Sequence, residues 1–134
     1  MSSEVVYRVV IPIEPRSKKN SQQIYVNSRT KRPFITQSDE YKRYERDCGF
    51  FLKHKPPEPI DYPVNVQCVF YRSTRRRIDL TNLIAATNDI FVKYGILRDD
   101  NREIVAGHDG SRVRYDKENP RAEITITKLG EDEL

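Results

Sequence analysis

The chain has 134 residues, of which 37% are hydrophobic and 33% charged, and its formal net charge is +4. This length is typical of one domain with its own core, so we expect residues 1–134 to form a single domain. No apolar run is long enough to span a membrane, and the start lacks the pattern of a secretory signal. Cys48 and Cys68 lack disulfide or zinc-site spacing, which predicts buried, reduced thiols in a cytoplasmic protein without a membrane partner.

Positive charge is concentrated in two segments of the chain. Residues 14–36 contain one acid, Glu14, and six basic residues, which are Arg16, Lys18, Lys19, Arg29, Lys31 and Arg32. The second group is Arg72, Arg75, Arg76 and Arg77. A single basic run is often only a solvated face. Two runs close to acidic residues instead indicate a surface for the phosphate backbone of a nucleic acid.

The first third of the chain reads as β-structure. Residues 5–11 are rich in β-branched side chains and apolar on both sides, which predicts a central strand that ends at Pro12. Residues 24–26 and 33–35 flank a basic turn and predict a short hairpin. Lys18, Lys19 and Asn20 lie in the polar loop before that hairpin and are candidate phosphate donors.

A helix and a strand follow the predicted hairpin. Ser38 is a good N-cap, and two acids in the first turn complement the helix dipole. Apolar residues then recur at helical spacing and predict a core-facing side, made of Tyr41, Tyr44, Cys48, Phe51 and Leu52. Three prolines end this helix by residue 59. Residues 64–71 alternate and predict a strand whose buried side carries Val64, Val66, Cys68 and Phe70.

The central element is a helix over residues 79–93. At about 100° per residue, its apolar side consists of Leu80, Leu83, Ile84, Thr87, Ile90, Phe91 and Tyr94. A neighbouring polar strip consists of Asp79, Asn82, Ala86, Asp89 and Lys93. Strands are predicted around 102–106 and 122–128, joined by a loop rich in turn formers over 108–120. The fold class is therefore α+β, with a small mixed β-sheet packed by two main helices.

Acidic residues around this helix are candidate metal ligands. Asp79 and Asp89 are ten positions apart, about 15 Å along a helix, so they cannot share one ion. Gly95 is placed to end the helix, and the chain after it could bring Asp99 and Asp100 back toward Asp79. Carboxylates that converge in this way bind Mg²⁺.

Each candidate ligand also has a structural interpretation. Asp79 suits an N-cap, a role that can coexist with metal binding, and the Asp99–Asp100 pair suits an exposed turn. His54 and His108 are isolated and are interpreted as bystanders. The sequence has no phosphate-binding glycine loop, zinc spacing or Ser/His/Asp grouping, so we expect no nucleotide cofactor.

Several segments together resemble a known family. RRRIDLTNL at 75–83, NDI at 88–90, Gly95 and LRDD at 97–100 resemble the core signature of the RusA family of Holliday junction resolvases. The resemblance extends to residues 12–20, 38–47 and 123–127, and so covers nearly the whole chain. Two positions differ from the family pattern, since Thr81 replaces its second helix aspartate and Ala85 replaces a frequent lysine.

The resemblance implies a homodimeric, Mg²⁺-dependent endonuclease that resolves four-way DNA junctions by paired nicks. It implies that Asp79, Asp99 and Asp100 hold the metal and act in catalysis. The implied DNA-binding residues are Arg16, Lys18, Lys19, Asn20, Arg75, Arg76, Arg77 and Asn82.

Two alternatives to a junction-resolving nuclease stay open. Thr81 and Ala85 favour a junction-binding protein without turnover, and the basic loops alone would suit a general RNA- or DNA-binding accessory module.

Overall fold

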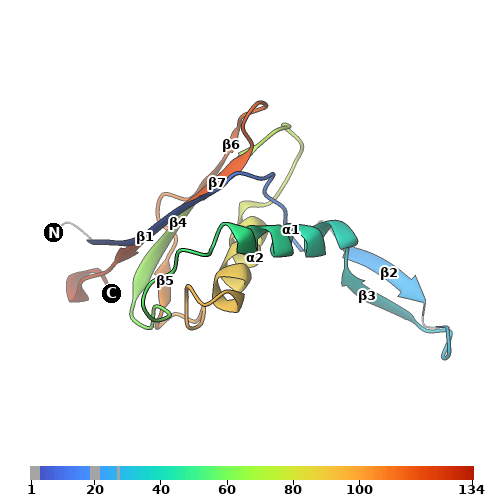
Figure 1. The fold of residues 1–134 in the computed structure, drawn as a ribbon, viewed down its shortest axis with the longest axis horizontal. Helices are drawn as coiled ribbons and strands as arrows, with labels where there is room; N and C mark the ends of the chain where they lie inside the picture. The colour runs from blue at the N-terminus through green and yellow to red at the C-terminus, as the bar shows by residue number, and fades with distance from the viewer. Residues whose placement is uncertain (1–3, 19–21, 27) are drawn as a thin grey trace.

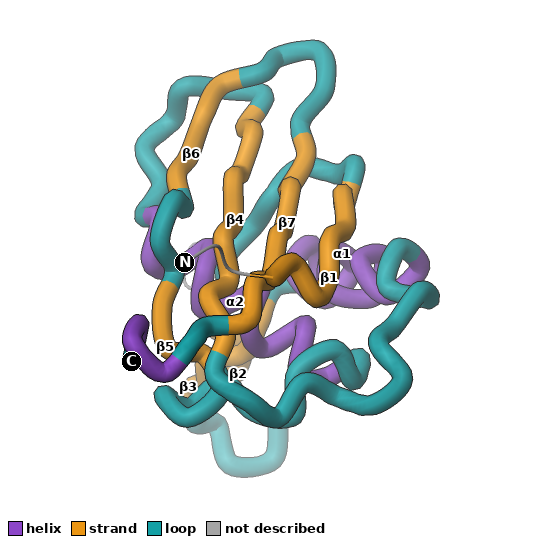
Figure 2. Tube along the Cα trace, turned by 90° about the vertical axis from the view of Figure 1, so that its left-hand side faces the viewer, coloured by secondary structure: helices purple, strands orange, loops and turns teal. Residues whose placement is uncertain are grey.

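The main body of the protein is a five-stranded mixed sheet with two helices on one face (Figures 1 and 2). The computed structural model describes residues 4–18, 22–26 and 28–134. The sheet strands are β1 (Glu4–Ile11), β4 (Val64–Arg72), β5 (Val105–Gly107), β6 (Arg112–Tyr115) and β7 (Arg121–Lys128). The helices are α1 (Asp39–Phe50) and α2 (Leu80–Lys93), and a short 3₁₀ turn, η2 (Glu131–Glu133), follows β7. The α+β class with two main helices is confirmed.

Strand β7 lies inside the sheet, antiparallel to β1 on one side and to β4 on the other. Strands β5 and β6 both run parallel to β4 and follow one another along its other edge. The side of β4 that faces the helices carries Val64, Val66, Cys68 and Phe70, all fully buried as predicted. These side chains pack with Ile124 and Ile126 of β7 to form the centre of the core.

The prediction that residues 5–11 form a central strand is wrong in position. β1 does form, but it lies at the end of the sheet, beside β7. Val5 and Val10 are 46% and 47% exposed, because they lie on the sheet face away from the helices. Apolar residues on both sides of a strand therefore do not here indicate burial on both sides.

The segment predicted as a loop at 108–120 contains a strand, β6. Its backbone pairs with the outer half of β4, where Arg112 lies opposite Val69 and Arg114 opposite Tyr71. Only Val113 is half-buried within an otherwise mostly exposed, charged stretch, so the local sequence has no apolar alternation. The strand predicted at 102–106 begins later, at Val105, because the Ile104 N–H closes a turn onto the Asn101 carbonyl (3.0 Å).

Helix α1 begins as predicted at Ser38, whose Oγ accepts a hydrogen bond from the Tyr41 N–H (3.0 Å). Tyr41, Tyr44 and Cys48 are buried along the core-facing side. Phe51 differs from the prediction and is 38% exposed, because the helix ends at Phe50 and Phe51 is its C-cap.

Helix α2 packs against the sheet on one side and contacts α1 on another. Lys93 Nζ lies 2.6 Å from Glu45 Oε1, and the Tyr94 hydroxyl donates to the Glu45 carbonyl (3.2 Å). Contact on two sides buries a wider arc than one apolar stripe predicts. Ala86 was placed on the polar strip but is 1% exposed. Gly95 closes the helix with φ of 80°, the left-handed conformation predicted for it.

Both cysteines are buried and free, as predicted. Burial raises the pKa of the Cys48 thiol and of the Cys68 thiol to about 12 each. Because the thiolate is the reactive form, neither side chain is a nucleophile near neutral pH. The cysteines therefore serve as small core side chains.

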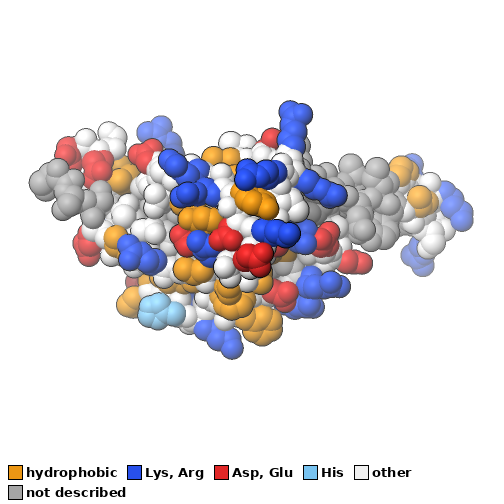
Figure 3. All heavy atoms as spheres, turned by 90° about the horizontal axis from the view of Figure 1, so that it is seen from above, with side chains coloured by type: hydrophobic (Ala, Val, Ile, Leu, Met, Phe, Trp, Pro, Cys, Tyr) orange, Lys and Arg blue, Asp and Glu red, His pale blue; other side chains and the backbone are white. Residues whose placement is uncertain are grey.

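The predicted hairpin forms from β2 (Gln22–Val26) and β3 (Pro33–Gln37) and projects away from the main body (Figure 1). Arg29, Lys31 and Arg32 lie in its exposed turn, and Figure 3 shows basic side chains at that end of the molecule. Within the part of the chain that the structure describes, no helix is long and apolar enough to cross a membrane.

Candidate nucleic-acid interface and metal site

The two basic segments seen in the sequence meet in the fold. The loop after β1 lies beside the segment between β4 and α2, and the two segments enclose most of a cavity of about 300 Å³. The cavity lies next to the start of α2, and its lining comprises Arg16, Ser17, Glu40, Arg72, Arg76, Arg77 and Ile78. Four guanidinium groups around one opening attract an anion such as a phosphate.

Glu14 links the loop after β1 to the segment between β4 and α2. Its carboxylate accepts hydrogen bonds from the Ser73 N–H (3.1 Å) and from the Ser73 hydroxyl. Arg72 Nη1 donates to the Pro15 carbonyl, and Arg72 Nε lies 3.6 Å from Glu14 Oε2. Glu14 and Ser73 were not predicted as site residues, and Arg72 was predicted only as a member of the second basic group. The sequence held one signal, since Glu14 is the only acid in a strongly basic stretch.

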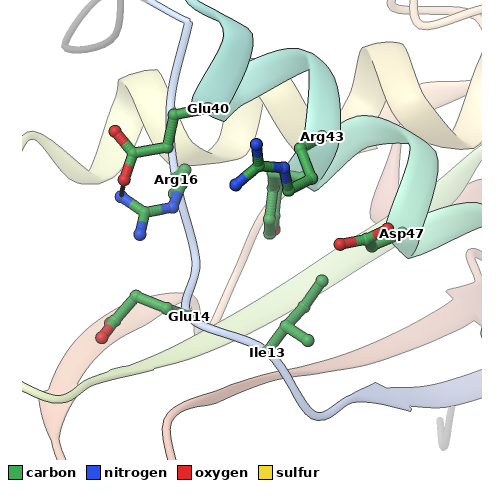
Figure 4. Close-up of a pocket in the computed structure, with 7 residues that line it drawn as sticks. Ile13, Glu14, Arg16, Glu40, Arg43 and Asp47 are labelled. Atoms are coloured by element: carbon green, nitrogen blue, oxygen red, sulfur yellow. Dashed lines mark ion pairs between the residues drawn. The ribbon is translucent and has the colours of Figure 1, made fainter.

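The predicted DNA-binding residues of the first loop already have acidic neighbours within the chain. Arg16 Nη1 lies 2.6 Å from Glu40 Oε1 in the first turn of α1, as Figure 4 shows. Lys18 Nζ lies 2.8 Å from Asp89 Oδ2 on α2. Both pairs are partly exposed, so they contribute little stability and exchange readily with other ions. Lys19 and Asn20 lie outside the described residues.

The arginines before α2 extend from the cavity toward the sheet. The side chains of Arg76 and Arg77 are exposed and line the cavity. The guanidinium carbon of Arg75 lies 4.2 Å from the centre of the Tyr115 ring, a cation–π contact with the end of β6. The chain thus directs two arginines into the cavity and holds the third against the sheet.

Asp79 occupies the N-cap position of α2, as its structural interpretation predicted. Its side chain, however, makes no capping hydrogen bond to the helix backbone. The carboxylate instead accepts from the Asn82 side-chain amide (3.2 Å) and is exposed at the helix start. The predicted DNA-binding residue Asn82 therefore holds the Asp79 carboxylate in place.

Asp99 and Asp100 lie at the opposite end of α2. The helix has 14 residues, about 20 Å of length. The N–H groups of Ile96 and Leu97 both bond to the Phe91 carbonyl, which keeps the chain at the helix C-terminus. The Arg98 N–H then bonds to the carbonyl of Ile60, a few residues before β4 begins. Asp79, by contrast, follows the far end of β4.

The expected return of Asp99 and Asp100 to the helix start therefore does not occur within one chain. Among residues 4–18, 22–26 and 28–134, no three His, Cys, Asp or Glu side chains are placed to hold a metal ion together. Asp99 Oδ1 accepts from the Asp100 N–H (2.7 Å), and its Oδ2 accepts from the Asn101 amide (3.3 Å). The chemistry of three exposed carboxylates fits a hard cation, but their placement in a single chain does not.

The contacts of His108 are with other parts of the fold. Its Nδ1 donates to the Val66 carbonyl (2.9 Å), and its Nε2 lies 3.3 Å from the amide nitrogen of Asn88. The interpretation of His108 as a bystander to the chemistry agrees with these contacts. Asn88 is 7% exposed, and its Oδ1 has no hydrogen-bond partner among the described residues.

The outward side of α2 has an uncharged part made of Thr81, Ala85 and Val92, with the exposed Asp89 and Lys93 beside it. Thr81 and Ala85 are exposed, and Val92 is half-buried. Small and apolar side chains along one face allow a second helix to approach closely.

The fold and the arginine-lined cavity are typical of a protein that acts on nucleic acid. A family model described as Endodeoxyribonuclease RusA matches residues 12–127. The chain therefore belongs to the RusA family of endodeoxyribonucleases, which confirms the resemblance seen in its sequence. A search of curated proteins finds no match.

Proposed function

We propose that this protein is a Mg²⁺-dependent homodimeric endonuclease that resolves four-way DNA junctions by paired symmetric nicks. Membership of the RusA family implies a junction-resolving endonuclease and carries the proposal. The meeting of the two basic segments beside Asp79 supports it, because DNA affinity depends on such phosphate contacts. We further propose that residues 1–134 act as one domain in the cytoplasm.

The metal site in this proposal is completed by a second copy of the chain. A two-fold axis beside α2 would bring the two helices together antiparallel, because such an interface uses the same surface on both copies. The start of one α2 would then lie beside the end of the other. Asp79 of one copy would share a site with Asp99 and Asp100 of the other, and the dimer would have two such sites.

The outward face of α2 supports this dimer. Thr81, Ala85 and Val92 form an uncharged strip along it, and Ala85 leaves room for a second helix.

Different residues of the chain would have different roles in cleavage. Arg76 and Arg77 would position the DNA backbone, and Arg75 would remain ordered against Tyr115. Asn82 would orient the Asp79 carboxylate toward the scissile group. Mg²⁺ held by Asp79, Asp99 and Asp100 would supply Lewis-acid activation of the phosphate and of the attacking water.

The test is cleavage of a synthetic four-way junction. With Mg²⁺, the proposal predicts nicked linear duplexes as products and no cleavage in EDTA. A linear duplex of the same sequence serves as the matched substrate and should be cut far more slowly. A junction that is bound but stays intact would favour a binding protein without turnover, which the separated carboxylates and Thr81 would then explain. Equal affinity for both substrates would favour a general nucleic-acid-binding module.

A further inference from the structure

The cavity beside α2 contains an ion pair that an incoming anion would have to break. Arg16 lines the cavity, and its Nη1 lies 2.6 Å from Glu40 Oε1. Glu40 lines the same cavity and is the one acid among its four arginines in the described structure. The side chains of Arg16 and Glu40 are 34% and 56% exposed, so water and solutes reach both.

The shape and chemistry of the cavity suit one phosphate. Its volume is about 300 Å³, enough for a phosphodiester group with part of a sugar. Arg72 is held at the wall by Glu14 and by the Pro15 carbonyl, which limits its movement. Arg16 lies on the loop after β1, and Arg76 and Arg77 lie on the segment between β4 and α2, so an anion would be contacted from two sides. Guanidinium groups bind phosphate oxygens with good geometry.

We propose that this cavity seats a non-scissile backbone phosphate of the nucleic acid, and that Glu40 pairs with Arg16 until that phosphate displaces it. Glu40 is then an internal competitor that lowers the affinity of the free protein for nucleic acid. The proposal rests on the proposed function for its substrate, but it requires only a phosphate backbone and no cleavage.

Arg43 offers the displaced Glu40 a new partner. It follows Glu40 by three positions on α1, the spacing at which helix side chains meet. Figure 4 shows its guanidinium group on the same side of the helix as Glu40 and Arg16. The release of Arg16 therefore does not leave Glu40 without a nearby cation.

The experiment compares two substitutions in one turn of α1. Glu40→Gln and Asp39→Asn remove the same charge from adjacent exposed positions, but only Glu40 contacts Arg16. Affinities for a four-way junction and a linear duplex are measured in EDTA. Because an exposed ion pair is weak, we expect Glu40→Gln to tighten binding about two- to fivefold more than Asp39→Asn does. In an Arg16→Gln background, which itself weakens binding, the extra gain should disappear.

Two results would overturn the proposal. Equal gains from Glu40→Gln and Asp39→Asn would mean that only net charge matters. An extra gain that persists in the Arg16→Gln background would mean that Glu40 does not act through Arg16. Thermal unfolding of each variant shows whether folding is intact. If the protein binds both substrates and cuts neither, the proposed nuclease function is wrong. The difference in binding affinity between Glu40→Gln and Asp39→Asn would still test whether the cavity binds a phosphate.

Discussion

Asp79→Asn and Asp100→Asn are each expected to slow junction cleavage severely while leaving junction binding intact. A bound metal contributes several kcal/mol to catalysis, so loss of one ligand should slow cleavage roughly a hundred- to a thousandfold. Both side chains are exposed, and asparagine is itself a good N-cap, so stability should change little. The measurement is single-turnover cleavage with saturating enzyme, together with binding in EDTA.

The control for these variants is Glu118→Gln. Glu118 is an exposed acid in the loop between β6 and β7, outside both groups of proposed ligands. It should cleave at the rate of the unmodified protein. If Asp79→Asn and Asp100→Asn also cleave at that rate, neither carboxylate holds a catalytic metal, and the assignment of the site is wrong.

A heterodimer of the two inactive variants is expected to recover activity. In the proposed dimer, each site takes Asp79 from one chain and Asp100 from the other. A dimer of one Asp79→Asn chain and one Asp100→Asn chain therefore has one intact site and one site lacking both groups. Because a symmetric dimer has two sites, nicking should recover to about half of the normal rate per dimer.

The products of this heterodimer give a second readout. One active site should produce nicked junctions and few paired cuts, so resolved linear duplexes should be scarce. The heterodimer is prepared with two different affinity tags. Its control is a dimer of Asp79→Asn with Asp79→Ala, which has no intact site in any arrangement. A heterodimer as inactive as this control would mean that each site is built within one chain or that the assigned ligands are wrong.

Local sequence signals predicted the helices better than the sheet edges. Ser38 and Gly95 marked a helix start and a helix end because capping depends on neighbours in the chain. β6 was not predicted, because its strand character comes from pairing with β4 about 43 residues earlier rather than from its own apolar content. The position of β1 at the sheet edge likewise depends on the order of distant strands.

In the candidate site, too, features set by local sequence were predicted and contacts between distant segments were not. Arg16 and Arg76 were chosen from local charge, and the fold brings their segments together around one cavity. The direction of the chain after Gly95 could not be predicted, since it is set by the pairing of Leu97 with Ile60. Glu40 was read only as a first-turn acid that complements the helix dipole. Its contact with Arg16 joins two distant segments and has no local signal.

The most direct measurement is a crystal structure of the protein grown with Mn²⁺, a Mg²⁺ substitute whose anomalous scattering locates it. The proposal predicts two peaks per dimer, each between Asp79 of one chain and the Asp99–Asp100 pair of its partner. Peaks contacted by the carboxylates of one chain alone would contradict the shared site. A dimer in which α2 lies far from its symmetry mate, with both groups of carboxylates free of metal, would contradict the proposed nuclease site.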